Sequence, residues 1–334
     1  MSVTGKVLSV NVSTTKGTPK RPVDHALIDG NGIAGDAHAG PWHRQVSILG
    51  WESIERFAAR EGRTFAPGDF AENLTLSGIR TGQVMLLDRF RIGTVELVVT
   101  QIGKTCHASG CTVSQLVGRC VMPQEGIFCR VLSGGTVRAG DPVDHFPRTL
   151  TCRVITLSDR AFAGQYPDRS GPMVSRMLEA FFQGKRWDLR IERAVLPDDP
   201  GRLRAELTAA CKAGTDVVFT TGGTGLGPRD ITPETVVEVC HKLIPGIMEN
   251  IRIKFASEKP NALLSRSVAG VAGTTQVYAL PGSVQAVTEY MGEILKTLEH
   301  VLFMIHGLDV HGRGGGAMQE GPFSEDCSTD DERK

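Results

Sequence analysis

The chain has 334 residues, more than a single hydrophobic core usually organises, so we expect two domains. Lys plus Arg and Asp plus Glu each number 37, and this zero net charge argues against the broad basic surface on which nucleic-acid binding depends. Apolar residues make up 40% of the chain, but no run approaches the roughly 18 consecutive apolar residues of a membrane helix.

The start of the chain predicts no export signal. Residues 1–6 lack the basic segment and following apolar segment of a signal peptide. The eight cysteines include no Cys-x-x-Cys pair, so neither a zinc ribbon nor a thioredoxin-like motif is indicated. We therefore expect a cytoplasmic protein with reduced thiols.

Residues 1–146 are predicted to form a β-rich domain, because their apolar segments are short and separated by glycines. One helix is expected at Trp51–Glu61, where Ile54, Phe57 and Ala58 have helical spacing. The expected strands are Lys6–Val12, Gln45–Leu49, Val84–Leu87 and Val95–Gln101.

A cysteine-containing segment follows the last of these strands and has three interpretations. Cys106 lies beside Lys104 and His107, and neighbouring cations lower the pKa of a thiol, so a reactive thiolate is the first. A metal site is the second, although Cys-x4-Cys-x8-Cys is not a familiar zinc spacing. The third is a set of small buried hydrophobic residues, which suits Cys129 best. The candidate metal ligands are Cys106, His107, Cys111 and Cys120.

The pattern changes at residues 147–150, which contain a proline and are predicted to be a linker. In residues 151–308 strands and helices alternate, which predicts a mostly parallel sheet covered by helices. Residues 309–334 are polar and then acidic, and are predicted to be a disordered tail. The expected strands are Arg153–Leu157, Asp188–Leu196, Asp216–Thr221 and Gln276–Leu280, and the expected helices are Pro172–Phe182, Pro200–Ala213, Pro233–Leu243 and Val284–Phe303.

A glycine-rich loop follows the strand Asp216–Thr221. Four glycines between Gly222 and Gly227 let the backbone approach a ligand and direct its N–H groups at anionic oxygens. Thr232 fits the N-cap and Pro233 the first position of a helix, whose N-terminus adds a partial positive charge. Because ligands of parallel sheets bind beyond the carboxyl ends of the strands, this loop is expected to hold a phosphate. A mobile surface loop is the alternative.

Carboxylates gather at the same expected edge of the sheet. Asp198 and Asp199 follow one strand, and Asp159, with Ser158, follows another. Asp230 lies in the glycine-rich loop, where it would repel a phosphate unless a divalent cation such as Mg²⁺ lay between them. Each aspartate could instead be a cap or a turn former, but their convergence on one edge favours a nucleotide site.

These stretches resemble the molybdopterin adenylyltransferase family. The motifs are "ITLSDRAFAG", "LPDD", "TTGGTGLGPRDITPE", "IPGIMENIR", "LSR" and "LPGS", in order over residues 151–307. The resemblance implies a three-layer α/β/α fold with a mostly parallel sheet, assembled as a homotrimer. It also implies transfer of AMP from Mg-ATP to the terminal phosphate of molybdopterin, with release of pyrophosphate.

The resemblance also implies roles for individual residues. Asp198 and Asp230 match the family's two acidic positions for catalysis and for handling Mg²⁺ with the nucleotide, and Ser158 and Asp159 join them as cofactor-binding candidates. A cradle for the pterin phosphate is implied at Thr221, Gly222, Gly223, Thr224 and Gly225. Other binding positions are implied at Thr232, Glu234, Ser265, Arg266, Pro281, Gly282 and Ser283.

The first half resembles a MOSC domain through "GIAGDAHAG", "WHRQVSIL", "PGDFAENLTLSGI", "IGKTCH" and "GGTVRAGD". This resemblance implies a barrel-like β domain that binds the molybdenum cofactor or carries sulfur on one cysteine, which maps to Cys106. Candidate pocket residues, each of which could equally be a turn former or a surface group, are Gly35, Asp36, His38, Arg44 and Asn73.

The sequence therefore predicts a two-domain enzyme of molybdenum cofactor biosynthesis, a nucleotidyltransferase with ATP and molybdopterin as substrates. The implied partners beyond these small molecules are a molybdenum insertase and molybdoenzymes. Two other functions stay open. One is a carrier of molybdopterin or its molybdenum cofactor without catalysis, and the other is a nucleotide pyrophosphatase on the same fold.

Overall fold

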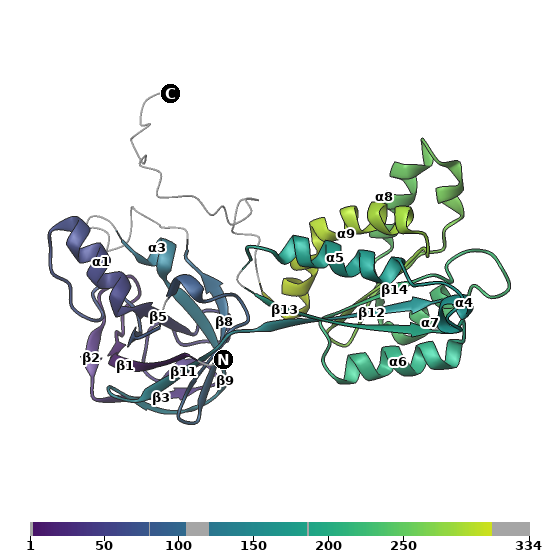
Figure 1. Cartoon of the computed structure of the whole chain (residues 1–334). Coiled ribbons are helices and arrows are strands. Elements are labelled where there is room, and N and C mark those ends of the chain that lie inside the picture. Colours follow the sequence, from purple (N-terminus) through teal and green to yellow (C-terminus); the bar gives the residue numbers. More distant parts are fainter. Residues whose placement is uncertain (1–2, 80, 105–119, 186, 309–334) are drawn as a thin grey trace, which may run out of the picture.

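The computed structural model describes residues 3–79, 81–104, 120–185 and 187–308. It contains a β-rich N-terminal domain and an α/β C-terminal domain, which lie side by side in Figure 1. The predicted tail, 309–334, lies outside the described residues. Among the helices of the described residues, none is both long and apolar enough to span a membrane.

The N-terminal domain is a closed β-barrel, as predicted. Within the described part of the chain, seven strands follow one another around the ring in the order β11-β7-β8-β9-β5-β6-β1, and pairing of β11 with β1 closes it. The strands of the ring are β1 (Val3–Val12), β5 (Val46–Gly50), β6 (Leu74–Ser77), β7 (Arg89–Ile92), β8 (Val95–Ile102), β9 (Ile127–Ser133) and β11 (Pro142–Phe146). Outside the ring are β2 (Arg21–Val23), β3 (His25–Asp29), β4 (Gly32–Ile33) and β10 (Gly135–Arg138).

Helix α1 (Trp51–Glu61) has the predicted bounds and ends at Gly62, which takes a left-handed conformation. Its apolar face buries Ile54 and Phe57 in a cluster with Phe70. Two further short helices of this domain are η1 (Thr81–Gln83) and α3 (Met122–Glu125).

The strand predicted at Val84–Leu87 is wrong. These residues form a turn, in which Leu87 has a φ of 70° and Asp88 accepts a hydrogen bond from Met85 N at 2.8 Å. Their apolar side chains are buried because they meet the second domain. The next strand is β7. A short apolar run alone does not distinguish a buried strand from a buried turn.

The C-terminal domain has three layers, as predicted. Its sheet has the order β13-β12-β14-β17-β16-β15, in which the first four strands are parallel, β16 is antiparallel to β17, and β15 is antiparallel to β16. The strands are β12 (Thr149–Leu157), β13 (Asp188–Leu196), β14 (Val217–Thr221), β15 (Lys242–Leu243), β16 (Ala269–Ala272) and β17 (Thr275–Leu280).

Alternate residues of the central strands face two separate helical layers. Val154 and Phe219 pack with one layer, whereas Ile155 and Val218 pack with the other. The first layer contains α5 (Ser170–Phe182), α8 (Pro245–Ala256) and α9 (Val284–Ile305), and the second contains α6 (Pro200–Lys212) and α7 (Thr232–Val239) (Figure 1). The short helices α4 (Asp159–Phe162) and η3 (Pro260–Leu264) complete the domain.

The structure differs from the prediction for this half in three places. The helix expected to continue to Leu243 ends at Val239, because Cys240 is extended and the chain then forms β15 against β16. Helix α8 was not predicted, since apolar Ile253 is 72% exposed and obscures the helical pattern. Strand β12 begins at Thr149, so the last two residues of the predicted linker lie within it.

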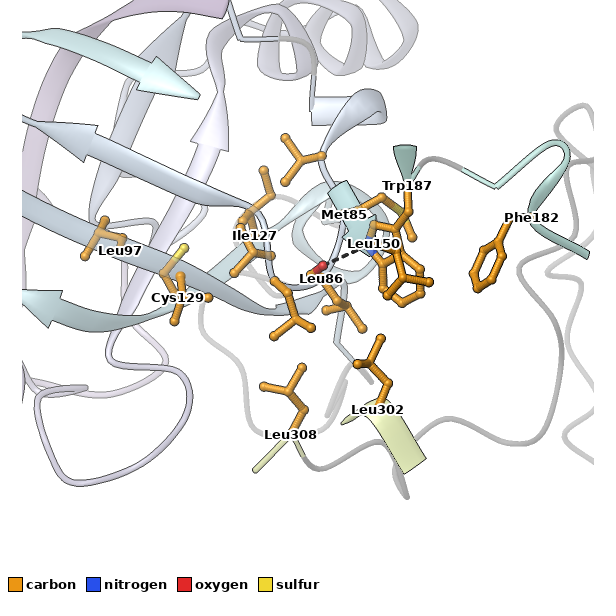
Figure 2. Close-up of a cluster of buried hydrophobic side chains, with 14 of the residues drawn as sticks. Met85, Leu86, Leu97, Ile127, Cys129, Leu150, Phe182, Trp187, Leu302 and Leu308 are labelled. Atoms are coloured by element: carbon orange, nitrogen blue, oxygen red, sulfur yellow. Dashed lines mark hydrogen bonds between the residues drawn. The ribbon is translucent and has the colours of Figure 1, made fainter. Parts of the chain in front are cut away.

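An apolar cluster joins the two domains (Figure 2). Trp187, only 4% exposed, donates a hydrogen bond from Nε1 to the Leu86 carbonyl at 3.0 Å. Asp88 fixes the connection from the barrel side, because it accepts from Arg148 N at 2.8 Å and lies 2.8 Å from His145 Nε2. The other apolar side chains include Met85, Leu150, Phe182, Leu302 and Leu308.

Candidate functional site

A cavity of about 680 Å³ lies at the carboxyl ends of the parallel strands. Such edges are where open α/β sheets bind ligands. The structure brings together here residues from four strand ends that the sequence analysis singled out. They are Ser158, Asp159, Asp198, Thr221, Gly223, Asp230, Gly282 and Ser283.

The glycine loop lies close to neighbouring backbone. Gly222 has a φ of +97°, and a Cβ there would overlap the carbonyl oxygen of Leu157. Gly223 has a φ of +65°, and a Cβ there would overlap the hydroxyl of Thr232. Gly282, from the loop after β17, would bring a Cβ to 3.3 Å from the Gly222 Cα. These positions admit only glycine without rearrangement.

Thr232 does not cap helix α7. The N-cap is Ile231, and the Thr232 hydroxyl instead donates to the Gly222 carbonyl at 2.8 Å. Thr232 is fully buried, so it holds the glycine loop against the helix rather than facing the cavity. The N-cap predicted from the Thr-Pro-Glu pattern was therefore placed one residue too late.

Asp198 and Asp159 lie in two neighbouring loops and join them through a reciprocal pair of hydrogen bonds. Asp198 N donates to Asp159 Oδ1 at 3.1 Å, and Asp159 N lies 3.4 Å from Asp198 Oδ2. Arg229 makes an ion pair with Asp159. Burial raises the pKa of Asp198, and the charges of Asp159 and Asp230 raise it further. The adjacent Asp199 caps α6 by accepting from Arg202 N at 2.7 Å, so it is the structural member of the Asp-Asp pair.

Asp230 shapes the loop that carries it. Its Oδ2 accepts from Gly227 N at 2.7 Å, and a Cβ on Gly225 would lie 2.8 Å from the same oxygen. Asp230 also lines the cavity. Asp230 therefore combines a structural role with a position at the site.

Other predicted residues lie outside the wall of this cavity. Arg266 binds the back of the loop, donating to the Gly225 carbonyl at 2.7 Å and the Asp230 carbonyl at 2.8 Å, and pairs with Glu234. Its amide donates to the Thr224 carbonyl at 3.0 Å. Ser265 exchanges a hydrogen bond with Ser267, and Pro281 precedes Gly282. Their roles toward a pterin stay predictions.

The sequence analysis missed a hydrogen-bonded network beneath the glycine loop. Asp168 accepts from Thr156 at 2.9 Å and from Ser170 at 3.1 Å, and Ser170 lies 2.8 Å from the Thr221 hydroxyl. The network joins the start of α5 to two strands. The signal that could have found it is the Asp-Arg-Ser-Gly stretch before Pro172, a typical helix-start pattern.

An aromatic residue and several arginines were also missed. Tyr166 lines the cavity, is 41% exposed, and is held by a 2.9 Å hydrogen bond between its hydroxyl and Ser158. The guanidinium carbon of Arg160 lies 5.1 Å from its ring centroid. Arg169 and Arg229 also contribute to the wall. The cavity thus offers both signs of charge and one aromatic face.

Among the candidate residues of the MOSC-like half, Asp36 and His38 contact each other. Asp36 makes a fully buried ion pair with Lys20 and accepts from His38 N at 2.9 Å. Burial opposes its ionisation, but hydrogen bonds from His38 and Lys20 outweigh burial and hold its pKa well below the usual range. Asn73 is fully buried and accepts from Ser47 Oγ at 2.9 Å, so it links strands. Gly35 has a φ of +80° and forms a turn.

Arg44 stacks on Trp42, with its guanidinium carbon 4.8 Å from the ring centroid, and its buried Nε has no partner within the described residues. Cys106, His107 and Cys111 lie outside the described residues, so the thiolate and the metal interpretations stay predictions. Elsewhere in the described chain no group of three or more His, Cys, Asp or Glu could hold a metal ion. Cys129 is fully buried, as predicted, and burial raises its pKa.

We expect Gly222→Ala to lower the free energy of unfolding by about 2 kcal/mol or more, because strained φ and overlap with Leu157 add together. Gly214→Ala is the matched control, since Gly214 has a similar φ of +73° but open space around it. We expect that control to lose only about 1 kcal/mol. Equal losses in denaturant unfolding would contradict a close approach at Gly222.

Comparison with known families matches residues 153–300 to the "Probable molybdopterin binding domain" and residues 35–144 to the MOSC domain. A molybdopterin adenylyltransferase of Helicobacter pylori is 31% identical over 161 residues, which cover 48% of this chain and 90% of that protein. The molybdenum cofactor biosynthesis bifunctional protein of Synechococcus elongatus is 37% identical over 159 residues, and the match spans 48% of each chain, about half the length of that relative.

Among solved structures, the tungsten cofactor synthesizing protein of Pyrococcus furiosus is 34% identical, with a TM-score of 0.42, and the match covers 48% of this chain and 98% of that one. A second molybdopterin adenylyltransferase, also from Pyrococcus furiosus, is 34% identical over 161 residues, and the match covers 91% of that protein. The C-terminal half of this chain belongs to the molybdopterin-binding domain family, and its N-terminal half is a MOSC domain.

Proposed function

We propose that this protein acts in molybdenum cofactor biosynthesis and that its C-terminal domain adenylylates molybdopterin with Mg-ATP. The observation that carries this proposal is the cavity in which the loop at Thr221 and Gly223 meets the carboxylates of Asp198 and Asp230. Backbone N–H groups of the glycine loop can bind phosphate oxygens, and the carboxylates can bind the cation that accompanies a phosphate. The relatives named as molybdopterin adenylyltransferases support the choice of substrate.

In this reaction a phosphate oxygen of molybdopterin forms a bond to the α-phosphorus of ATP, and the bond from that phosphorus to the bridging oxygen breaks. Pyrophosphate leaves with the electron pair. Such transfers depend mainly on positioning and charge neutralisation, so no protein nucleophile is required. Asp198 and Asp230 would hold Mg²⁺, which neutralises phosphate charge when bound. Phosphate oxygens and water would complete its oxygen ligands, since two carboxylates alone do not.

The remaining side chains of the cavity fit a nucleotide. Arg160 and Arg229 bring positive charge to the same wall as the carboxylates. Arg229 is 66% exposed, so it can move from Asp159 to a phosphate. Backbone N–H groups of the glycine loop and the N-terminus of α7 would receive the pterin phosphate.

For the N-terminal half we propose binding of molybdenum cofactor or sulfur transfer through Cys106. We further propose domains at residues 1–146 and 151–308 with a connection at 147–150, and assembly as a homotrimer through the second domain. Exchange with a molybdenum insertase or molybdoenzymes would follow from the same pathway. Mass spectrometry for a persulfide on Cys106, with Cys120→Ser as the control, tests the sulfur role.

The test of the adenylyltransferase is pyrophosphate release by the purified full chain with Mg-ATP, with and without molybdopterin. Release that requires molybdopterin supports the proposal. Release without any pterin would show a nucleotide pyrophosphatase instead. Molybdopterin binding with no release would show a carrier.

The pH dependence of the reaction should report Asp198. If the reaction requires the ionised carboxylate of Asp198, the rate should fall as the pH falls. The apparent pKa of this decrease should lie above the ordinary 3.8, because burial raises the pKa of Asp198. Arg229→Gln removes a positive charge that lowers this pKa, so the acid limb of kcat/KM should move to higher pH. Arg204→Gln, which removes an exposed arginine paired with Glu238, is the control. Movement of the limb to lower pH would contradict the assignment.

A further inference from the structure

Arginines from both domains gather at the junction, far from the cavity described above. Strand registers place Arg89 of β7 and Arg130 of β9 on either side of Val98 of β8, in one row across the barrel. Residues paired across neighbouring strands point to the same side of a sheet. Val98 is only 6% exposed, so the two arginines flank a covered patch of the barrel.

The second domain supplies two more groups at this place. His306 is the C-cap of α9, and the next residue, Gly307, would bring a Cβ to 4.0 Å from Arg130 Nη1. Arg148 precedes β12. After burial, the charges of Arg148, Arg130 and Arg89 are among the causes that lower the pKa of His306, which agrees with their lying around one imidazole.

The positive charge at the junction is incompletely neutralised. Asp216 pairs with Arg148, but its other oxygen already accepts from Thr151 N at 2.8 Å and Thr151 Oγ1 at 3.0 Å. Arg89 and Arg130 make no ion pair within the described part of the chain. Crowded like charges without a counter-ion are unfavourable.

Two nitrogens at the junction also lack partners. Arg148 Nε and His306 Nε2 are buried and have no hydrogen-bond partner among the described residues. Arg148 Nε always carries a proton, whereas His306 Nε2 carries one in only one of the two neutral tautomers. A buried N–H without an acceptor is costly, so Arg148 Nε indicates a missing acceptor or a group that moves to meet one. Guanidinium groups bind phosphate oxygens through paired, charge-assisted hydrogen bonds.

We propose that the junction formed by Arg89, Arg130, Arg148 and His306 binds a phosphate-type oxyanion that bridges the two domains. This site is separate from the carboxyl-edge cavity. Arg148 lies just before the first residue of β12, whereas Leu157 at the cavity is the last, which is about 30 Å along a strand. The proposal does not depend on adenylyltransferase activity. Inorganic phosphate, pyrophosphate and the phosphates of a nucleotide share the required chemistry.

The test is calorimetric titration of the full chain with inorganic phosphate, pyrophosphate and ATP, each without Mg²⁺ and at constant ionic strength. The strongest binder among the three identifies the source of the phosphate. We expect Arg130→Gln to weaken its binding about ten-fold or more, and Arg89→Gln to do the same. Arg138→Gln removes an exposed arginine from another part of the barrel and should leave binding unchanged.

Two further variants distinguish binding at the junction from binding in the cavity and from occupation by residues 309–334. Asp198→Asn alters the carboxyl-edge cavity and should leave the Arg130-dependent binding in place. A chain ending at residue 308 tests whether the acidic residues that follow are the true occupant, and it should bind phosphate as the full chain does. The proposal is overturned if no oxyanion binds, if Arg130→Gln binds as well as Arg138→Gln, or if phosphate binds only after residues 309–334 are removed.

Discussion

Asp198→Asn is expected to slow molybdopterin-dependent pyrophosphate release by about 10²- to 10³-fold, the loss typical of removing one electrostatic group from a phosphoryl-type transition state. Asparagine keeps the size of the side chain and removes the negative charge that would hold Mg²⁺. Asp198 lines the cavity, and its amide is fixed by Asp159 at 3.1 Å, so the backbone should keep its place.

Asp199→Asn is the matched control for this experiment. Asp199 is adjacent in sequence and accepts from Arg202 N at the start of α6, a role that asparagine performs equally well. Its rate and its free energy of unfolding should stay close to those of the unsubstituted protein. If both variants lost activity equally, the effect would be one of net charge and not of the site. If neither lost activity, a carrier would be favoured over an enzyme.

Trp187→Ala is expected to lower the free energy of unfolding by about 3–5 kcal/mol, the usual cost of deleting a buried tryptophan. Trp187 packs against Phe182 and Phe303, with ring centroids 6.3 Å and 5.6 Å away, and also bonds the Leu86 carbonyl of the barrel. Its loss removes contacts within the α/β domain and between the domains together. Calorimetry should therefore show a lower melting temperature and separate transitions for the two domains.

Trp187→Phe separates packing from the hydrogen bond. It keeps a buried ring but loses the bond from Nε1 to Leu86 and part of the ring volume, which together we expect to cost about 2 kcal/mol. A single transition should persist in this variant. If Trp187→Ala also unfolded in one transition at an unchanged temperature, the apolar junction would contribute little to coupling the domains.

The candidate site illustrates how far local patterns reach. Thr221, Gly223, Asp198 and Asp230 were identified because each lies at the end of a predicted strand or in the loop that follows it, and parallel strands end at one edge. Asp168 was not identified, because its partner Thr156 lies on a strand and meets it only in the folded domain, where Thr156 also accepts a hydrogen bond from Thr221 on the neighbouring strand. Thr232 was assigned a cap because a local pattern does not show the nearby Gly222 carbonyl.

By itself, the sequence determined the order of the two domains, in which the barrel precedes an alternating α/β domain. It also determined the glycine and aspartate motifs. Each of these features depends on residues that are close together in the chain. Only the tertiary structure decided which carboxylates line the cavity, which residues hold the loop from behind, and how the domains join. The turn at Val84–Leu87 shows the physical reason. Its apolar side chains resemble a strand locally, but they are buried by Trp187, about a hundred positions further along the chain, and no local pattern encodes that contact.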